Sequence, residues 1–119
     1  MPERYTPVYW EHLENLVQQS DVVIDRTKGE SHPTYAEMLY PLDYGYLAGT
    51  TSADGGGIDV FIGAGGGRKP VGLVCTIDLT KRDAEIKILL DCTEAEMKAI
   101  IDFLNQSDGM HALLVRRKD

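Results

Sequence analysis

Apolar residues recur at helical spacing near both ends of the chain. Four positions share one face of a helix near the N-terminal end: Tyr9, Leu13, Leu16 and Val17. We expect this helix over residues 8–19, with Thr6 as its cap. A second helix is predicted over residues 93–106, because Thr93 and Glu96 have the spacing of a capping box ahead of an apolar stripe.

Between these helices, short apolar runs separated by polar and glycine-rich turns predict strands. They are expected at residues 22–24, 58–62, 71–79, 85–90 and 112–115. The proline-bearing segment 40–46 is expected to be extended with a tight turn. Glu85 and Lys87 should point to the same face of their strand, since side chains alternate along a strand. The pattern favours a mainly β fold with α-helices, a small barrel with one helix at each end of the chain.

The chain of 119 residues is long enough for one domain, which we place at residues 1–119. A domain of this size buries about two-thirds of its surface, so it holds a core without staples. Apolar runs all fall short of the ~20 residues that a membrane span needs. The first residues lack the basic-then-apolar order of a secretory signal, so we expect a cytoplasmic protein. Cys75 and Cys92 are expected to be free thiols.

The formal net charge of −7 disfavours nucleic-acid binding, which needs a basic face. Two interpretations of the acidic balance are open. The carboxylates either form a solvated surface, or some of them cluster around divalent cations. Asp54 and Asp59 bear on this choice, because they flank a glycine turn that leads into a strand. They are either metal ligands at one rim, or a turn residue and a charge on an edge strand.

Several segments in fixed order resemble the family I soluble inorganic pyrophosphatases. They are VVID at 22–25, YPLDYGYL at 40–47, DGGGIDV at 54–60 and DAEIKIL at 83–89. The family signature is an Asp-x-Asp-x-x-Asp turn after a YP-x-x-YG segment, and here Asp54 and Asp59 match its first and last aspartates. The resemblance covers about residues 22–90.

The resemblance implies an OB-like barrel of five strands with peripheral helices, and hydrolysis of pyrophosphate by metal-activated water. It implies Mg²⁺, or Mn²⁺, as the cofactor and assembly into a homo-oligomer. The metal ligands it indicates are Asp54, Asp59, Asp78 and Glu85. The catalytic residues it indicates are Tyr44, Asp78 and Lys87, and the substrate-binding residues are Lys28, Tyr40 and Lys87.

The chain also departs from the family pattern. Gly56 stands where the family has the middle aspartate, which orients or deprotonates the attacking water. The hairpin that carries the family's phosphate-binding cations is almost absent. Nearby cations either rebuild a phosphate site or are surface charges: Arg26, Lys28, Lys81, Arg82 and Lys87. His32 is a further candidate base or ligand.

Three functions therefore stay open. The first is a metal-dependent phosphoanhydride hydrolase with pyrophosphate as its default substrate. The second is a degenerate barrel that binds metal or phosphate without turnover, which Gly56 and the missing hairpin favour. The third is an OB-type nucleic-acid binder, which the acidic charge disfavours.

Overall fold

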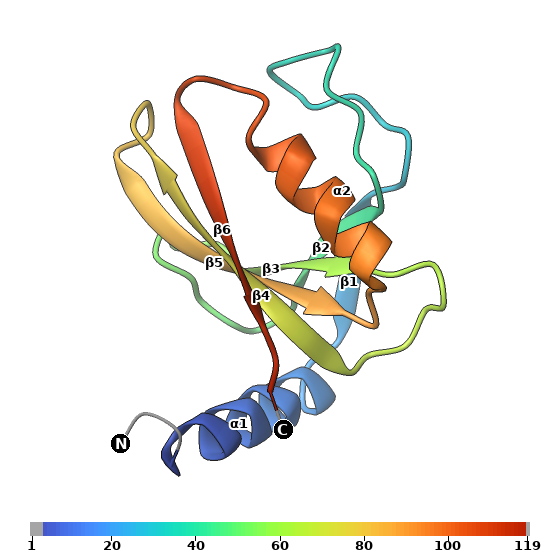
Figure 1. The fold of residues 1–119 in the computed structure, drawn as a ribbon, viewed down its shortest axis with the longest axis vertical. Helices are drawn as coiled ribbons and strands as arrows, with labels where there is room; N and C mark the ends of the chain where they lie inside the picture. The colour runs from blue at the N-terminus through green and yellow to red at the C-terminus, as the bar shows by residue number, and fades with distance from the viewer. Residues whose placement is uncertain (1–3, 119) are drawn as a thin grey trace.

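Six strands form one sheet, and two helices pack against it (Figure 1). The structure is a computed structural model that describes residues 4–118. In chain order the elements are α1 (Thr6–Gln18), β1 (Val22–Arg26), β2 (Asp43–Leu47), β3 (Ile58–Ile62), β4 (Pro70–Asp78), β5 (Asp83–Leu90), α2 (Glu94–Leu104) and β6 (Met110–Arg116). The predicted extent of the domain, residues 1–119, stays a prediction, and residues 1–3 and 119 lie outside the described part.

The strands lie in the order β1-β2-β3-β5-β4-β6. All neighbours are antiparallel except β3 and β5, which run parallel with Asp59 opposite Lys87. Within residues 4–118, β1 and β6 are the two edges and do not pair, so the sheet is curved but open. The mainly β, OB-like class is confirmed. The count of five strands is wrong, because the segment expected only to be extended forms β2 and pairs with both β1 and β3.

Gly45 makes this extra pairing possible. It lies in β2 opposite Ile24 of β1. A Cβ atom at this position would stand 1.8 Å from the carbonyl oxygen of Val23. Only glycine therefore allows β1 to approach β2 this closely, and the β1–β2 pair carries Arg26 and Tyr44 to the site described below.

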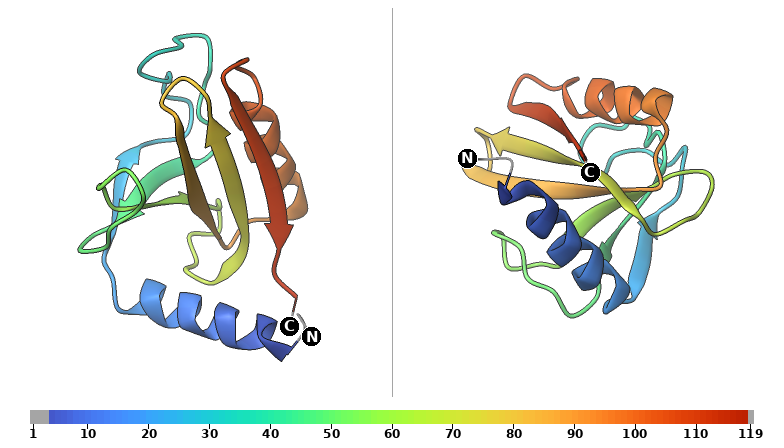
Figure 2. Two further views of the ribbon diagram at one scale, coloured as in Figure 1. Left: turned by 90° about the vertical axis from the view of Figure 1, so that its left-hand side faces the viewer. Right: turned by 60° about the horizontal axis from the view of Figure 1, so that its bottom comes forward.

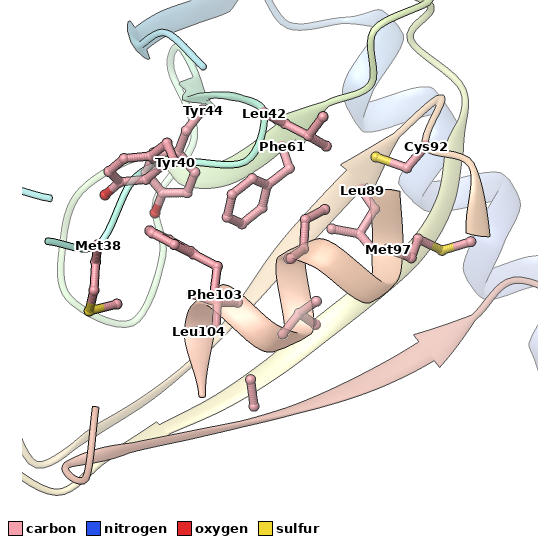
Figure 3. Packing of buried hydrophobic residues seen from close by; sticks show 13 residues of the cluster. Met38, Tyr40, Leu42, Tyr44, Phe61, Leu89, Cys92, Met97, Phe103 and Leu104 are labelled. Atoms are coloured by element: carbon pink, nitrogen blue, oxygen red, sulfur yellow. The ribbon is translucent and has the colours of Figure 1, made fainter. Parts of the chain in front are cut away.

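The two helices pack against different sides of the sheet: α1 lies across one end of the curved sheet, and α2 lies beside β6 (Figure 2). Under α1, Trp10, Leu13 and Val17 pack in one cluster with side chains of β2 to β5. Under α2, the second cluster contains buried residues of the helix, of β2 to β6 and of the preceding loop, including the aromatic rings drawn in Figure 3. Ile88 faces α1 and Leu89 faces α2, and both are fully buried. Burial of each such side chain contributes about 1.5–3 kcal/mol.

The ends of the helices test the sequence signals directly. The capping box is confirmed: Thr93 Oγ1 accepts the Glu96 N–H at 3.1 Å, and Glu96 Oε1 accepts the Thr93 N–H at 2.9 Å. The cap predicted at Thr6 is wrong, because the helix already includes Thr6 and its N-cap residue is Tyr5, which makes no side-chain cap bond. Neither helix is long and apolar enough to cross a membrane, among the residues described.

Candidate active site

A cavity of about 410 Å³ lies on the α2 side of the sheet, between strands β2 to β5 and the loop that precedes β2. Eight charged residues line it: Asp25, Arg26, Asp54, Asp59, Asp78, Lys81, Glu85 and Lys87. Tyr40 and Tyr44 line it as well, so the structure brings together every predicted site residue except Lys28. Lys28 is exposed and is not part of the lining, and Arg26 and Lys81 are the cations found there beside Lys87.

Strand alternation and register explain why residues so far apart in sequence meet. Asp59 of β3 lies opposite Lys87 of β5, and Glu85 is two residues away on the same face of β5. Tyr44 of β2 lies opposite Phe61, two residues after Asp59. The expectation that Glu85 and Lys87 share a face is confirmed by the ion pair between them, in which the nitrogen and oxygen are 3.8 Å apart.

Lys87 stands at the centre of the polar part of the cavity. Its side chain is only 7% exposed, and Nζ donates to Asp59 Oδ2 and to the hydroxyl oxygen of Tyr44, each at 2.9 Å. The same ammonium lies 5.3 Å from the centroid of the Tyr44 ring. Burial, followed by the charge of Asp59, raises the pKa of the Tyr44 hydroxyl far above its ordinary value. Tyr44 is therefore a neutral phenol that orients the lysine.

Glu85 is the least satisfied group of the site. Its side chain is 8% exposed, and within residues 4–118 its Oε2 has no hydrogen-bond partner. The same is true of the hydroxyl of Thr76, which lies opposite Glu85 on β4. Burial raises the pKa of Glu85, Lys87 lowers it, and the neighbouring Asp54 carboxyl raises it again. Each unpaired buried polar group costs about 1–3 kcal/mol, so this corner favours a bound partner.

Asp54 is held as a charged carboxylate at the rim. Its Oδ1 accepts the Ser52 hydroxyl at 2.7 Å and the Gly56 N–H at 2.9 Å. These two hydrogen bonds lower its pKa to about 2. The turn is possible because Gly55 has a φ of +87°, the left-handed region that glycine favours. Gly56 itself does not have a positive φ.

Asp78 closes the β4–β5 turn while it lines the cavity. Its Oδ1 accepts the backbone N–H groups of Thr80 at 2.9 Å and Lys81 at 3.0 Å. Oδ1 is therefore committed to the turn, and Oδ2 is the oxygen left for chemistry in the cavity.

Arg26 is one of the cations whose role the sequence left open, and it lies beside the cavity. The β1–β2 register shifts between Ile24 and Arg26, so that Arg26 lies opposite Tyr44 and beside the cavity. Its Nη1 donates to the Tyr40 hydroxyl at 3.0 Å. A bulge re-aims side chains in this way, and a one-residue bulge leaves no readable signal in a short apolar run.

His32 also enters the cavity, in a fixed orientation. Its Nδ1 accepts the backbone N–H groups of Thr34 at 3.0 Å and Tyr35 at 3.3 Å. Burial, followed by the charges of Arg26 and nearby lysines, lowers its pKa. The neutral ring therefore carries its proton on Nε2 and is a hydrogen-bond donor there.

The glycine-rich loop at residues 63–67 does not offer its backbone N–H groups to a phosphate. The Ala64 N–H donates to Glu96 Oε2, and the Gly67 N–H donates to Asp91 Oδ2, each at 2.9 Å. Carboxylates of the chain already use these donors, and they would repel an anion.

The acidic residues fit a hard cation that keeps much of its own water. In the described part of the chain, no three His, Cys, Asp or Glu side chains are placed to hold a metal ion on their own. Mg²⁺ does not need such a cage, since one or two carboxylates with waters and phosphate oxygens complete its shell. The unpaired Glu85 Oε2, with the Asp54 carboxylate beside it, provides ligands of that kind.

Solved structures of inorganic pyrophosphatases have a similar fold. The enzyme from Helicobacter pylori aligns with a TM-score of 0.59 at 15% identity, over 80% of this chain and 81% of that one. The enzyme from Coxiella burnetii aligns with a TM-score of 0.57 at 16% identity, over 82% of this chain and 84% of that one. The enzyme from Neisseria gonorrhoeae aligns with a TM-score of 0.56 at 15% identity, over 82% of this chain and 75% of that one. No protein-family model and no curated protein sequence matches the chain. The chain therefore has a pyrophosphatase-like fold.

Proposed function

We propose that the protein is a Mg²⁺-dependent hydrolase of phosphoanhydrides, with inorganic pyrophosphate as its default substrate. One observation carries the proposal: five carboxylates and three cations line a single cavity in a pyrophosphatase-like fold. The carboxylates outnumber the cations, so a substrate with several negative charges needs added cations to enter.

Glu85 and Asp54 are the residues that would hold Mg²⁺, with Asp59 and Asp78 beside them. When bound, the ion lowers the pKa of water and neutralises charge that develops on phosphoryl oxygens. Mn²⁺ prefers similar oxygen ligands and is the alternative ion.

The cations of the chain would bind and orient the phosphates. Lys87 already donates two hydrogen bonds, to Asp59 and Tyr44, and these hold its side chain in place. Its ammonium has a third N–H, which would donate to a phosphoryl oxygen. Arg26, fixed through Tyr40, and Lys81, which also lines the cavity, would bind the second phosphate. This division assigns to Arg26 and Lys81 the role that the sequence suggested for Lys28.

Asp78 is the proposed proton acceptor. In the step, a water oxygen bonds to one phosphorus and the bridging P–O bond of that phosphorus breaks. The second phosphate leaves with the electron pair of that bond, and one water proton passes to Asp78 Oδ2. Gly56 has no side chain to do this, and a general base contributes about 10²–10⁴-fold to such a reaction. In this proposal Asp78 takes the place of the missing aspartate.

The test is phosphate release from pyrophosphate with Mg²⁺, with and without a chelator. Wild type should release phosphate only when Mg²⁺ is present, and Glu85→Gln should bind Mg²⁺ at least tenfold more weakly by calorimetry. Glu11→Gln is the matched control, because Glu11 is an exposed glutamate of α1 and does not line the cavity. Equal Mg²⁺ binding by wild type and Glu85→Gln would show that the metal assignment is wrong.

A module that binds without turnover is the second candidate. Gly56 favours it, and so does the pairing of Asp59 with Lys87, which occupies one predicted metal ligand. This candidate predicts that Mg²⁺ and pyrophosphate bind but that phosphate release with Mg²⁺ stays at the rate without protein.

A further inference from the structure

The cavity has a second half that bare pyrophosphate does not use. Its walls there are aromatic and apolar, and they include His32, Tyr35, Phe103 and Met110. We propose that the site takes a nucleoside polyphosphate, whose base packs on this wall while its phosphates occupy the charged half. The inference rests on the proposed function, because it assumes a phosphate site.

The aromatic wall is continuous. The His32 ring lies nearly parallel to the Tyr40 ring, with their centroids 6.1 Å apart. The Tyr35 ring also contacts the His32 ring, with their centroids 5.3 Å apart. Phe103 packs on Tyr40 (Figure 3), and the centroids of the two rings are 4.7 Å apart. Tyr40 and Phe103 are only 4% exposed and form the rigid base, whereas Tyr35 is 39% exposed. Stacking on such rings suits a flat heterocycle of any base type.

Two loops, the end of α2 and the start of β6 supply this half, and none of them belongs to the strands that carry the carboxylates. Tyr35 lies in the segment between β1 and β2, and Ser107 lies between α2 and β6 (Figure 1). Tyr35, Met38 and Ser107 line both the main cavity and a neighbouring one between these loops. The apolar half therefore opens outward, and leaves room for a group attached to the phosphates.

Size and charge agree with this occupant. A cavity of about 410 Å³ falls in the range of roughly 300–1,000 Å³ that holds drug-sized ligands, which are much larger than two phosphate groups. Arg26 lies where the halves meet, since it bonds the Tyr40 hydroxyl and stands 5.4 Å from the centroid of that ring. A cation there suits the phosphate nearest to the nucleoside.

The experiment compares two non-hydrolysable probes, methylenediphosphonate and α,β-methylene-ADP, by calorimetry with saturating Mg²⁺. Wild type should bind the nucleotide probe at least tenfold more tightly. Tyr35→Ala should reduce this ratio of affinities about fivefold or more, since stacking of a base on one aromatic side chain contributes roughly that much. Tyr9→Ala should leave the ratio unchanged, because Tyr9 is 47% exposed on α1 and does not line the cavity.

Each result separates the inference from the function beneath it. Equal affinity for the two probes in wild type, or the same ratio in Tyr35→Ala, would overturn the nucleotide inference and leave the pyrophosphate site standing. Failure of both probes to bind would overturn both. Tight, Tyr35-dependent binding of the nucleotide probe without hydrolysis of ADP or pyrophosphate would support the inference and refute the hydrolase.

Discussion

Lys87→Met is the substitution whose effect follows most directly from the structure. Methionine keeps most of the aliphatic volume of lysine and removes only the ammonium. That ammonium is the sole cation within hydrogen-bond distance of Asp59 among the described residues, and it is also the ion-pair partner of the buried Glu85. The variant therefore leaves two carboxylates close together without compensation.

The expected loss is about 3 kcal/mol of unfolding free energy, at the low end of the range for breaking a buried ion pair. The Lys87 and Glu85 side chains are 7% and 8% exposed, so solvent screens them little. Asp59 is 23% exposed, and water there recovers part of the loss. The lost hydrogen bond from Lys87 to Tyr44 adds to the loss of unfolding free energy.

Mg²⁺ should restore most of this loss, because it would neutralise the carboxylates that Lys87 neutralises in wild type. An ion at 100 times its dissociation constant stabilises the folded state by about 2.7 kcal/mol. Urea denaturation with and without Mg²⁺ measures both effects. The stabilisation by Mg²⁺ should be larger in Lys87→Met than in wild type.

Lys98→Met is the matched control. Lys98 pairs with Asp102 at 3.0 Å on α2, but its side chain is 77% exposed. Such a pair contributes only about 0.3–0.5 kcal/mol. If Lys87→Met cost no more than this control, or if Mg²⁺ stabilised wild type and Lys87→Met equally, the view of Lys87 as the counterion of a metal site would be wrong.

Three further predictions follow from single positions. Gly56→Asp should fold, because a Cβ atom at position 56 meets only Asp54 Oδ1, at 3.3 Å. The variant should raise pyrophosphate hydrolysis about tenfold in a phosphate-release assay. A folded variant with no gain would show that the missing carboxylate does not limit the rate. His32 has a lowered pKa in the folded state, so its contribution to stability is complete above pH ~6.5 and is lost as the pH falls toward that lowered pKa; denaturation between pH 7 and 5 should show a smaller pH dependence in His32→Gln, and equal slopes would contradict this. Gly45→Ala should destabilise the fold by more than ~2 kcal/mol in urea, because the new methyl group collides with the Val23 carbonyl, and a wild-type midpoint would show that β1 is free to move.

Local chemistry in the sequence was sufficient for the elements that depend on near neighbours. The capping box at Thr93, the strand at 58–62 and the shared face of Glu85 and Lys87 all follow from spacing within a few residues. The acidic residues of the site could also be named, because the segments that carry them resemble a known family in fixed order.

Tertiary structure alone decided what depends on contacts across the sheet. That 43–47 is a strand depends on two partners and on the close approach at Gly45, which no local propensity records. The bulge before Arg26 placed that cation, rather than Lys28, in the lining of the cavity. The aromatic half required the loop around Tyr35 to meet the end of α2, residues that lie about 70 positions apart. Sequence spacing specifies which side chains share a strand face, but the distance between loops is set only when the sheet and both helices pack.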